Sequence, residues 1–103
     1  MSVMLMVLLG VDTAREAEML SGFETRHDQS IRLGALSHEI RKLQAPGEDA
    51  GRWLGTMTFR DMDHFNQFSA AQDADPEAQD TIGSILGPGG VASILSMRVA
   101  ESA

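Results

Sequence analysis

One histidine of the sequence stands among apolar residues at helical spacing, where an imidazole could do chemistry. His27 falls between Phe23 and Ile31, four residues from each, in a segment that predicts a helix. It can be a buried residue satisfied by one hydrogen bond. It can also be an acid, a base or a hydrogen-bond donor that faces a ligand, because an imidazole exchanges protons close to neutral pH. Both interpretations stay open, and His27 is the candidate catalytic residue.

A second group of residues could line a small-molecule pocket. Trp53, Met57 and Phe59 alternate along one predicted strand, and Gly55 leaves space between them. Core packing is the simpler interpretation of such a large-small-large series. An aromatic-lined gap opposite His27 would instead suit a compact hydrophobic or aromatic ligand. The three large side chains are therefore candidate substrate-binding residues.

Two further polar side chains could contact a ligand from other strands. His38 alternates with Leu36 and Ile40, which predicts a position at the edge of a sheet or the rim of a barrel. Arg98, in the last predicted strand, could orient a carboxylate or a phenolate, as could Arg41. A salt bridge to one of the many acidic residues is the commoner role for such an arginine.

The sequence offers no clear metal or nucleotide site. It has no cysteine, and its three histidines lack a short metal-ligand spacing; His64, beside two aspartates, is expected to be solvated. Residues 87–90 are rich in glycine but lack the lysine of a phosphate-binding loop. No serine-histidine-aspartate set can be placed. We therefore expect neither a metal nor a bound cofactor.

The composition indicates a soluble globular domain that spans residues 1–103. Fifteen acidic and eight basic side chains give a net charge of −7, which disfavours nucleic acid and anionic membranes as partners. The lack of cysteine fits a reducing compartment. The N-terminal apolar run meets Asp12 too early for a spanning helix and has no positive flank, so a bacterial-type cytoplasmic location is expected.

Residues 3–9 are apolar at every position, and this run is long enough for one strand. A strand with one wet face alternates apolar and polar residues, so this strand should be covered on both faces. Val3, Leu5, Val7 and Leu9 would lie on one side and Met4, Met6 and Leu8 on the other. The sequence does not say which set meets the helices.

The remaining elements follow from periodicity and capping signals. Thr13 and Glu16 form a capping-box pattern, which predicts a helix whose apolar stripe is Ala17, Leu20, Phe23, His27 and Ile31. Period-two patterns predict strands over 35–43 and 53–59, joined by a polar turn. A second helical region, broken at Asp75-Pro76 and stopped by residues 87–90, precedes a strand over 91–99.

This order, β-α-β-β-α-β, predicts an α+β ferredoxin-like domain: a four-stranded antiparallel sheet with its helices on one face. Nothing in the chain covers the other face. Burying a large apolar side chain is worth roughly 1.5–3 kcal/mol, so a second copy is the expected cover. We expect a homodimer that closes sheet to sheet into an α/β barrel.

Three segments resemble a known family. Gly34 to Ile40, Phe59-Arg60-Asp61 and Asp75-Pro76-Glu77 are similar to segments of the dimeric α/β-barrel superfamily, in particular its antibiotic-biosynthesis-monooxygenase and NIPSNAP-like groups. Quinone-forming members commonly use a tryptophan late in the third strand and an asparagine on the first, where this chain offers Phe59 and no asparagine. Haem-degrading members need a histidine that residues 76–90 lack.

The resemblance leaves three functions open. The first is a monooxygenase-like enzyme that acts without a cofactor on a compact hydrophobic or aromatic substrate. The second is a non-catalytic ligand-binding or stress-responsive dimer. The third comes from a looser similarity of His27, Ala45-Pro46 and Asp75-Pro76 to the YCII-related proteins, and it requires His27 and Asp75 to meet.

Overall fold

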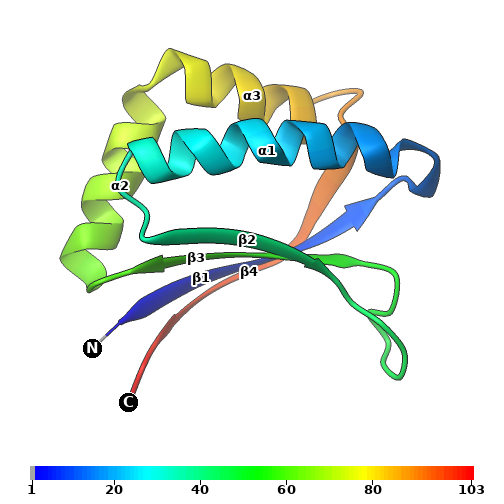
Figure 1. Cartoon of the computed structure of the whole chain (residues 1–103), viewed down its shortest axis with the longest axis horizontal. Coiled ribbons are helices and arrows are strands. Elements are labelled where there is room, and N and C mark those ends of the chain that lie inside the picture. Colours follow the sequence, from blue (N-terminus) through cyan, green and yellow to red (C-terminus); the bar gives the residue numbers. More distant parts are fainter. Residues whose placement is uncertain (1) are drawn as a thin grey trace.

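The computed structural model describes residues 2–103 as a four-stranded antiparallel sheet with helices on one face (Figure 1). The strand order is β2-β3-β1-β4. The strands are β1 (Val3–Val11), β2 (Ser37–Lys42), β3 (Trp53–Phe59) and β4 (Ala92–Glu101). The helical elements are the 3-10 turn η1 (Thr13–Arg15), α1 (Glu16–Arg32), α2 (Met62–Ala74) and α3 (Pro76–Leu86). The predicted α+β ferredoxin-like architecture is confirmed.

Strand β1 is apolar throughout because it lies in the middle of the sheet, between β3 and β4. Val3, Leu5 and Leu9 are buried beneath the helices, whereas Met4 is 38% exposed on the opposite face. Since side chains alternate along a strand, Met6 and Leu8 share that opposite face with Met4. Within residues 2–103 no helix covers this face, which is the lower one in Figure 1.

The start of α1 differs from the predicted capping box. Asp12 caps η1 through its Oδ1, which accepts from the Ala14 N–H at 3.0 Å. Glu16 does not reach back along the chain; its Oε1 accepts from Lys42 Nζ at 2.8 Å and from the Trp53 indole N–H at 3.4 Å. The helix was predicted correctly, but its cap was not, because Glu16 has partners on the sheet.

The second helical region is broken where the sequence predicts. Asp61 caps α2 by accepting from the His64 N–H at 2.8 Å. Asp75 ends this helix and caps α3 by accepting from the Ala78 N–H at 3.0 Å, with Pro76 at the first helical position. A proline there fits because the first helical N–H has no partner within the helix.

The predicted apolar stripe of α1 was correct at Phe23, which packs against the core, but wrong at Leu20, His27 and Ile31, which are exposed. Leu20 and Ile31 are 40% and 41% exposed. The side chains that α1 buries are instead Met19, Arg26, Gln29 and Ser30. Helix α1 packs against α3 at Gly22, where an added Cβ would lie 3.0 Å from Cγ1 of Ile85. This close approach fixes the rotation of the helix, and three of the residues that it turns inward are polar.

Two apolar clusters hold the layers together. Phe59, with no exposed surface, packs edge-on against Phe65 and tilted against Phe68, at ring distances of 5.2 and 5.0 Å. Met19, Val91 and Ala92 form the second cluster. Among residues 2–103, no helix has both the length and the apolar character needed to cross a bilayer.

Candidate ligand-binding cavity

A cavity of about 210 Å³ lies between the helices and the sheet. Its walls are mostly apolar and come from β1, β3, α1 and α3; they include Leu5, Val7, Phe23, Met57, Ile82 and Ile85. Gly55 contributes to the floor, and a Cβ built on it would meet nothing closer than the Val7 carbonyl oxygen at 3.9 Å. The missing side chain at Gly55 therefore helps to keep the space open.

Besides Thr56 of β3, three polar residues line this apolar space: Arg26 from α1, His38 from β2 and Gln72 from α2. These three residues come from elements that are separated in the sequence. Arg26 and His38 are nearly inaccessible to solvent, since each is 7% exposed. A few polar groups in an apolar pocket are typical of a site that orients a small molecule.

His38 is buried and not at a rim, contrary to the expectation from the sequence. Its ring lies 4.3 Å from that of Phe23 and stacks on that of His27 at 5.9 Å. Its Nδ1 is buried without a hydrogen-bond partner among residues 2–103. Burial, reinforced by the positive charge of Arg26, lowers the pKa of His38 to about 4. The imidazole is therefore neutral near pH 7, and it is a weaker base than an ordinary histidine.

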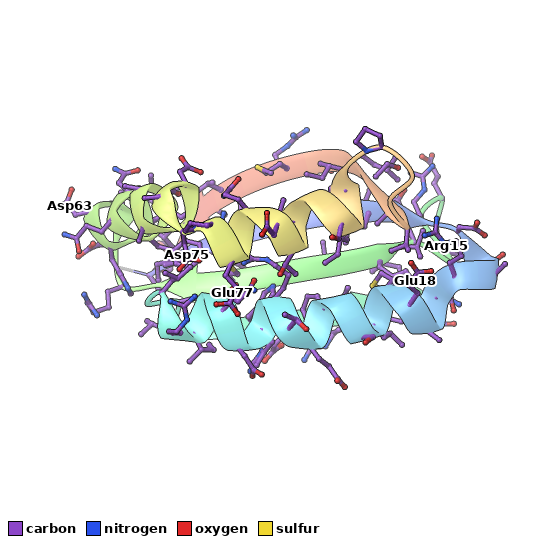
Figure 2. All side chains as sticks on the ribbon, turned by 90° about the horizontal axis from the view of Figure 1, so that it is seen from above. Arg15, Glu18, Asp63, Asp75 and Glu77 are labelled. Atoms are coloured by element: carbon purple, nitrogen blue, oxygen red, sulfur yellow. The ribbon has the colours of Figure 1, made fainter. Side chains whose placement is uncertain are left out.

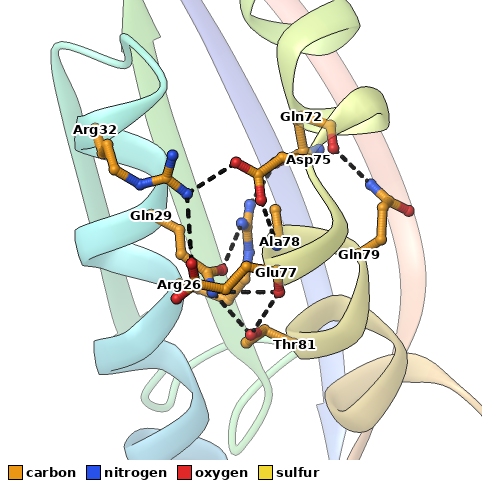
Figure 3. Close-up of polar contacts among 9 residues, drawn as sticks. All are labelled: Arg26, Gln29, Arg32, Gln72, Asp75, Glu77, Ala78, Gln79 and Thr81. Atoms are coloured by element: carbon orange, nitrogen blue, oxygen red, sulfur yellow. Dashed lines mark hydrogen bonds and ion pairs between the residues drawn. The ribbon is translucent and has the colours of Figure 1, made fainter.

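Arg26 is the functional candidate that sequence reasoning missed. Its Nη1 donates to the Gln29 side-chain oxygen at 3.2 Å, and its Nη2 donates to that of Gln72 (Figure 3). It forms no ion pair with any carboxylate of residues 2–103. Burial lowers the pKa of Arg26, and the more distant charge of Asp75 opposes this shift. Its partner Gln72 lies 46 residues away, so spacing along the sequence gives no signal for this position.

Hydrogen bonds between α1 and α3 hold the top of the cavity in place. Gln29 Nε2 donates to the Thr81 hydroxyl at 2.9 Å, and Arg32 Nη2 pairs with Asp75 at 2.9 Å (Figure 3). Viewed from above, Asp75 and Glu77 lie where α2 gives way to α3, facing α1 (Figure 2). The Asp75 carboxylate is thus engaged by Arg32 and by its own helix cap.

His27, the predicted catalytic residue, is exposed and lies outside the cavity. It borders a shallower depression with Phe23, Glu24 and Asp28. Its Nδ1–H donates to the His38 carbonyl oxygen at 2.8 Å. No hydrogen bond joins it to Asp75 in the described part of the chain, so the pairing that a YCII-like chemistry requires is absent there.

The other predicted ligand contacts are dispersed. Met57 lines the cavity, while Phe59 lies in the apolar core. Trp53 packs at the other end of β3, with Lys42 Nζ 5.8 Å from its ring centre. Arg98 is exposed on the opposite face of the sheet, in register with Met6. The structure therefore brings Met57 and His38 together at the cavity, and it places Trp53, Phe59 and Arg98 elsewhere.

His64 is buried, although the sequence predicts a solvated position. Its Nδ1 accepts from the Arg60 N–H at 3.0 Å, and its Nε2–H donates to the Gly34 carbonyl oxygen at 2.7 Å. Nε2 thus joins α2 to the turn before β2, and Nδ1 holds the turn between β3 and α2. Across residues 2–103, no group of three or more histidine, aspartate or glutamate side chains has the geometry to hold a metal ion.

No protein-family model matches the chain, and no curated protein matches it in sequence. Solved structures match its fold. One is a mutant of SnoaB, a cofactor-independent oxygenase from Streptomyces nogalater, which is 17% identical in sequence to this chain. The two structures match with a TM-score of 0.71, and the match covers 98% of this chain and 92% of SnoaB. A Chloroflexus aurantiacus protein assigned as an antibiotic biosynthesis monooxygenase is 14% identical. Its structure matches with a TM-score of 0.66, and the match covers 100% of this chain and 94% of that protein.

A NIPSNAP-like domain protein from Burkholderia xenovorans is also 14% identical, with a TM-score of 0.62 over 96% of this chain and 81% of that one. These matches confirm the resemblance to the monooxygenase-like and NIPSNAP-like groups at the level of fold. At such low identity they say nothing of the reaction.

Proposed function

We propose that this chain is a small homodimeric enzyme that binds a compact hydrophobic or aromatic molecule in the helix-sheet cavity and oxygenates it without a cofactor. The observation that carries the proposal is an apolar cavity that also holds a neutral imidazole, His38, with an unpartnered Nδ1, beside a buried guanidinium, Arg26. The likeness in fold to a cofactor-independent oxygenase supports this choice of reaction.

His38 is the proton acceptor in this proposal. A substrate whose CH₂ carbon is activated by neighbouring rings and a carbonyl loses a proton to the imidazole, and the resulting carbanion supplies the electrons that reduce O₂. One oxygen atom enters the substrate as a new carbonyl, and the other leaves as water with the two hydrogens of the CH₂ group. His27 acts as a positioning residue, because its ring donates to the backbone of His38 and stacks on its ring.

The cavity itself can be tested with Gly55→Val and anthrone as the probe. The added side chain has room at its Cβ and would extend into the cavity, so the variant should fold yet lose at least about tenfold in O₂ uptake. Gly83→Ala is the matched control, since its Cβ would meet nothing within 4 Å. Equal O₂ uptake by Gly55→Val and the unaltered protein would contradict the cavity as the reaction site.

His38→Gln separates binding from chemistry in the same assay. It should still bind anthrone while O₂ uptake falls to the buffer rate, because glutamine cannot take up the proton. If the unaltered protein binds anthrone but consumes no O₂ above the buffer rate, the non-catalytic ligand-binding dimer is the better description.

The proposed dimer rests on the sheet face opposite the helices, which we call the outer face. Its large apolar side chains come from β1, β3 and β4 and are Met4, Met6, Leu8, Leu54 and Leu95. They lie between polar margins on β2 and β4. An apolar face of this kind lowers the stability of the protein when it is exposed to solvent. A second copy supplies the complementary apolar surface.

Charge on the outer face supports a two-fold pairing. Glu39, Thr56, Met6 and Arg98 form one row across the sheet, in register. Glu39 and Arg98 therefore stand at opposite edges. A two-fold axis that runs along the strands sets the β2 edge of one copy over the β4 edge of the other. Each Glu39 then faces the partner's Arg98.

A further inference from the structure

We propose that the ligand of the helix-sheet cavity is an organic anion, and that Arg26 is the group that binds its negative charge. This inference rests on the proposed function of the cavity and adds the chemical class of its ligand. The carboxylate of an aromatic acid and the oxyanion of a phenol or enol share this chemistry.

The first argument is that Arg26 is a buried charge without a counter-ion. It is 7% exposed, and among residues 2–103 its partners are the neutral amide oxygens of Gln29 and Gln72. Burying an unpaired guanidinium is costly, and native structures commonly pair such a group with a carboxylate. The chain carries 15 acidic residues and a net charge of −7, yet none of the described ones pairs with Arg26.

The second argument is that the nearby acid is held elsewhere. Asp75 is close enough to act on the charge of Arg26, but its carboxylate pairs with Arg32 at 2.9 Å and accepts from the Ala78 N–H at 3.0 Å. The Asp75 carboxylate thus points to Arg32 and to the start of α3 (Figure 3). Arg26 is left facing the cavity that it lines.

The third argument is that the guanidinium is held in position and still has donors to offer. A guanidinium has five N–H donors, and the amide oxygens of Gln29 and Gln72 engage two. Gln29 is in turn held by the Thr81 hydroxyl, and the main-chain carbonyl of Gln72 accepts from the Gln79 side chain at 2.9 Å. Amide partners orient Arg26 without neutralising it, which suits a binder of anions.

The test uses 2-naphthoate and 2-naphthamide, two probes of nearly the same shape that differ in charge, with binding measured by calorimetry. The unaltered protein should bind the carboxylate about 10- to 100-fold more tightly than the amide, the range expected for charge-assisted hydrogen bonds. Arg26→Met should lose this preference while still binding 2-naphthamide. Equal affinity of the unaltered protein for the two probes would overturn the inference while leaving the cavity as a ligand site.

A second variant guards against misfolding of Arg26→Met. Gln72→Glu places a carboxylate on the guanidinium in nearly the same shape, so it should raise the thermal stability and abolish the preference for 2-naphthoate. A folded Gln72→Glu protein that keeps the preference would overturn the role of Arg26. If the unaltered protein binds neither probe nor anthrone, the proposed function fails together with the inference.

Discussion

At the scale of single residues, the side chains that matter most are polar groups in apolar surroundings. The sequence predicts His38 as a ligand contact but places it at a rim, and it gives no prediction for Arg26. The decisive contacts of Arg26 come from Gln29 and from Gln72, 46 residues away. A pairing across that distance leaves no periodic trace in the sequence.

Burial of His38 gives the stability a defined pH dependence. The pKa of His38 is about 4 in the folded chain against an ordinary 6.5, so the unfolded chain binds a proton first as the pH falls. The folded state should lose about 2 kcal/mol from this group between pH 7 and pH 5, and the loss should level off below pH 4. Urea unfolding followed by the fluorescence of Trp53, the one tryptophan, measures it.

The matched variant for this measurement is His38→Gln, which has no titrating group at the site. Its stability should change less between pH 7 and pH 5 than that of the unaltered protein, at the same protein concentration. This window lies above the range in which most carboxylates titrate. A parallel loss of stability in both proteins would show that His38 is not held neutral by the fold.

At the scale of elements, the type and order of the helices and strands could be predicted because their signals are local. The Asp75-Pro76 break and residues 87–90 punctuate the chain, and the predicted 53–59 strand matches β3. The rotation of α1 could not be predicted from apolar spacing alone. It is set by the approach of Ile85 to Gly22, and this tertiary contact leaves Leu20 exposed.

Asp75 joins α1 to α3, and its substitution should therefore lower the stability of the protein. Asp75→Ala deletes the cap of α3 and the partner of Arg32, so the free energy of unfolding should fall by about 1–2 kcal/mol. Asp73→Ala, at an exposed position near the end of α2, is the control and should change it by less than about 0.5 kcal/mol. Urea denaturation of the two variants would contradict the joint role if their stabilities were equal.

At the scale of the whole molecule, the sheet separates the two proposed functions, which are ligand binding and pairing with a second copy. The helix side of β1 borders the cavity through Leu5 and Val7, and the outer side presents Met4, Met6 and Leu8. The sequence predicts that both sides of this strand are covered. It could not say which set faced which layer, because both sets are large and apolar and the assignment depends on where the helices cross the sheet.

The proposed dimer can be tested with two leucines, Leu8 on the outer face of the sheet and Leu20 on helix α1. Leu8→Glu places a charge in the proposed interface and should give a monomer by light scattering at micromolar concentration, where the unaltered protein should be a dimer. Leu20→Glu, at an exposed position on α1, should stay dimeric. A monomer for the unaltered protein would refute the pairing outright.

A charge swap tests the direction of that pairing. Glu39→Arg should weaken the dimer by setting two positive charges against each other, and the double change Glu39→Arg with Arg98→Glu should restore it. If the double variant dissociates as readily as the single one, the axis does not run along the strands.

The claim on which the whole account depends is that the helix-sheet cavity receives the ligand. The most direct measurement is a titration of isotope-labelled protein with 1-naphthol, followed by the backbone amide resonances. The account predicts shifts concentrated at Val7, Phe23, Gly55 and Met57, which line the cavity. Shifts confined to the outer face around Met4 and Leu8, or no shifts at all, would contradict it.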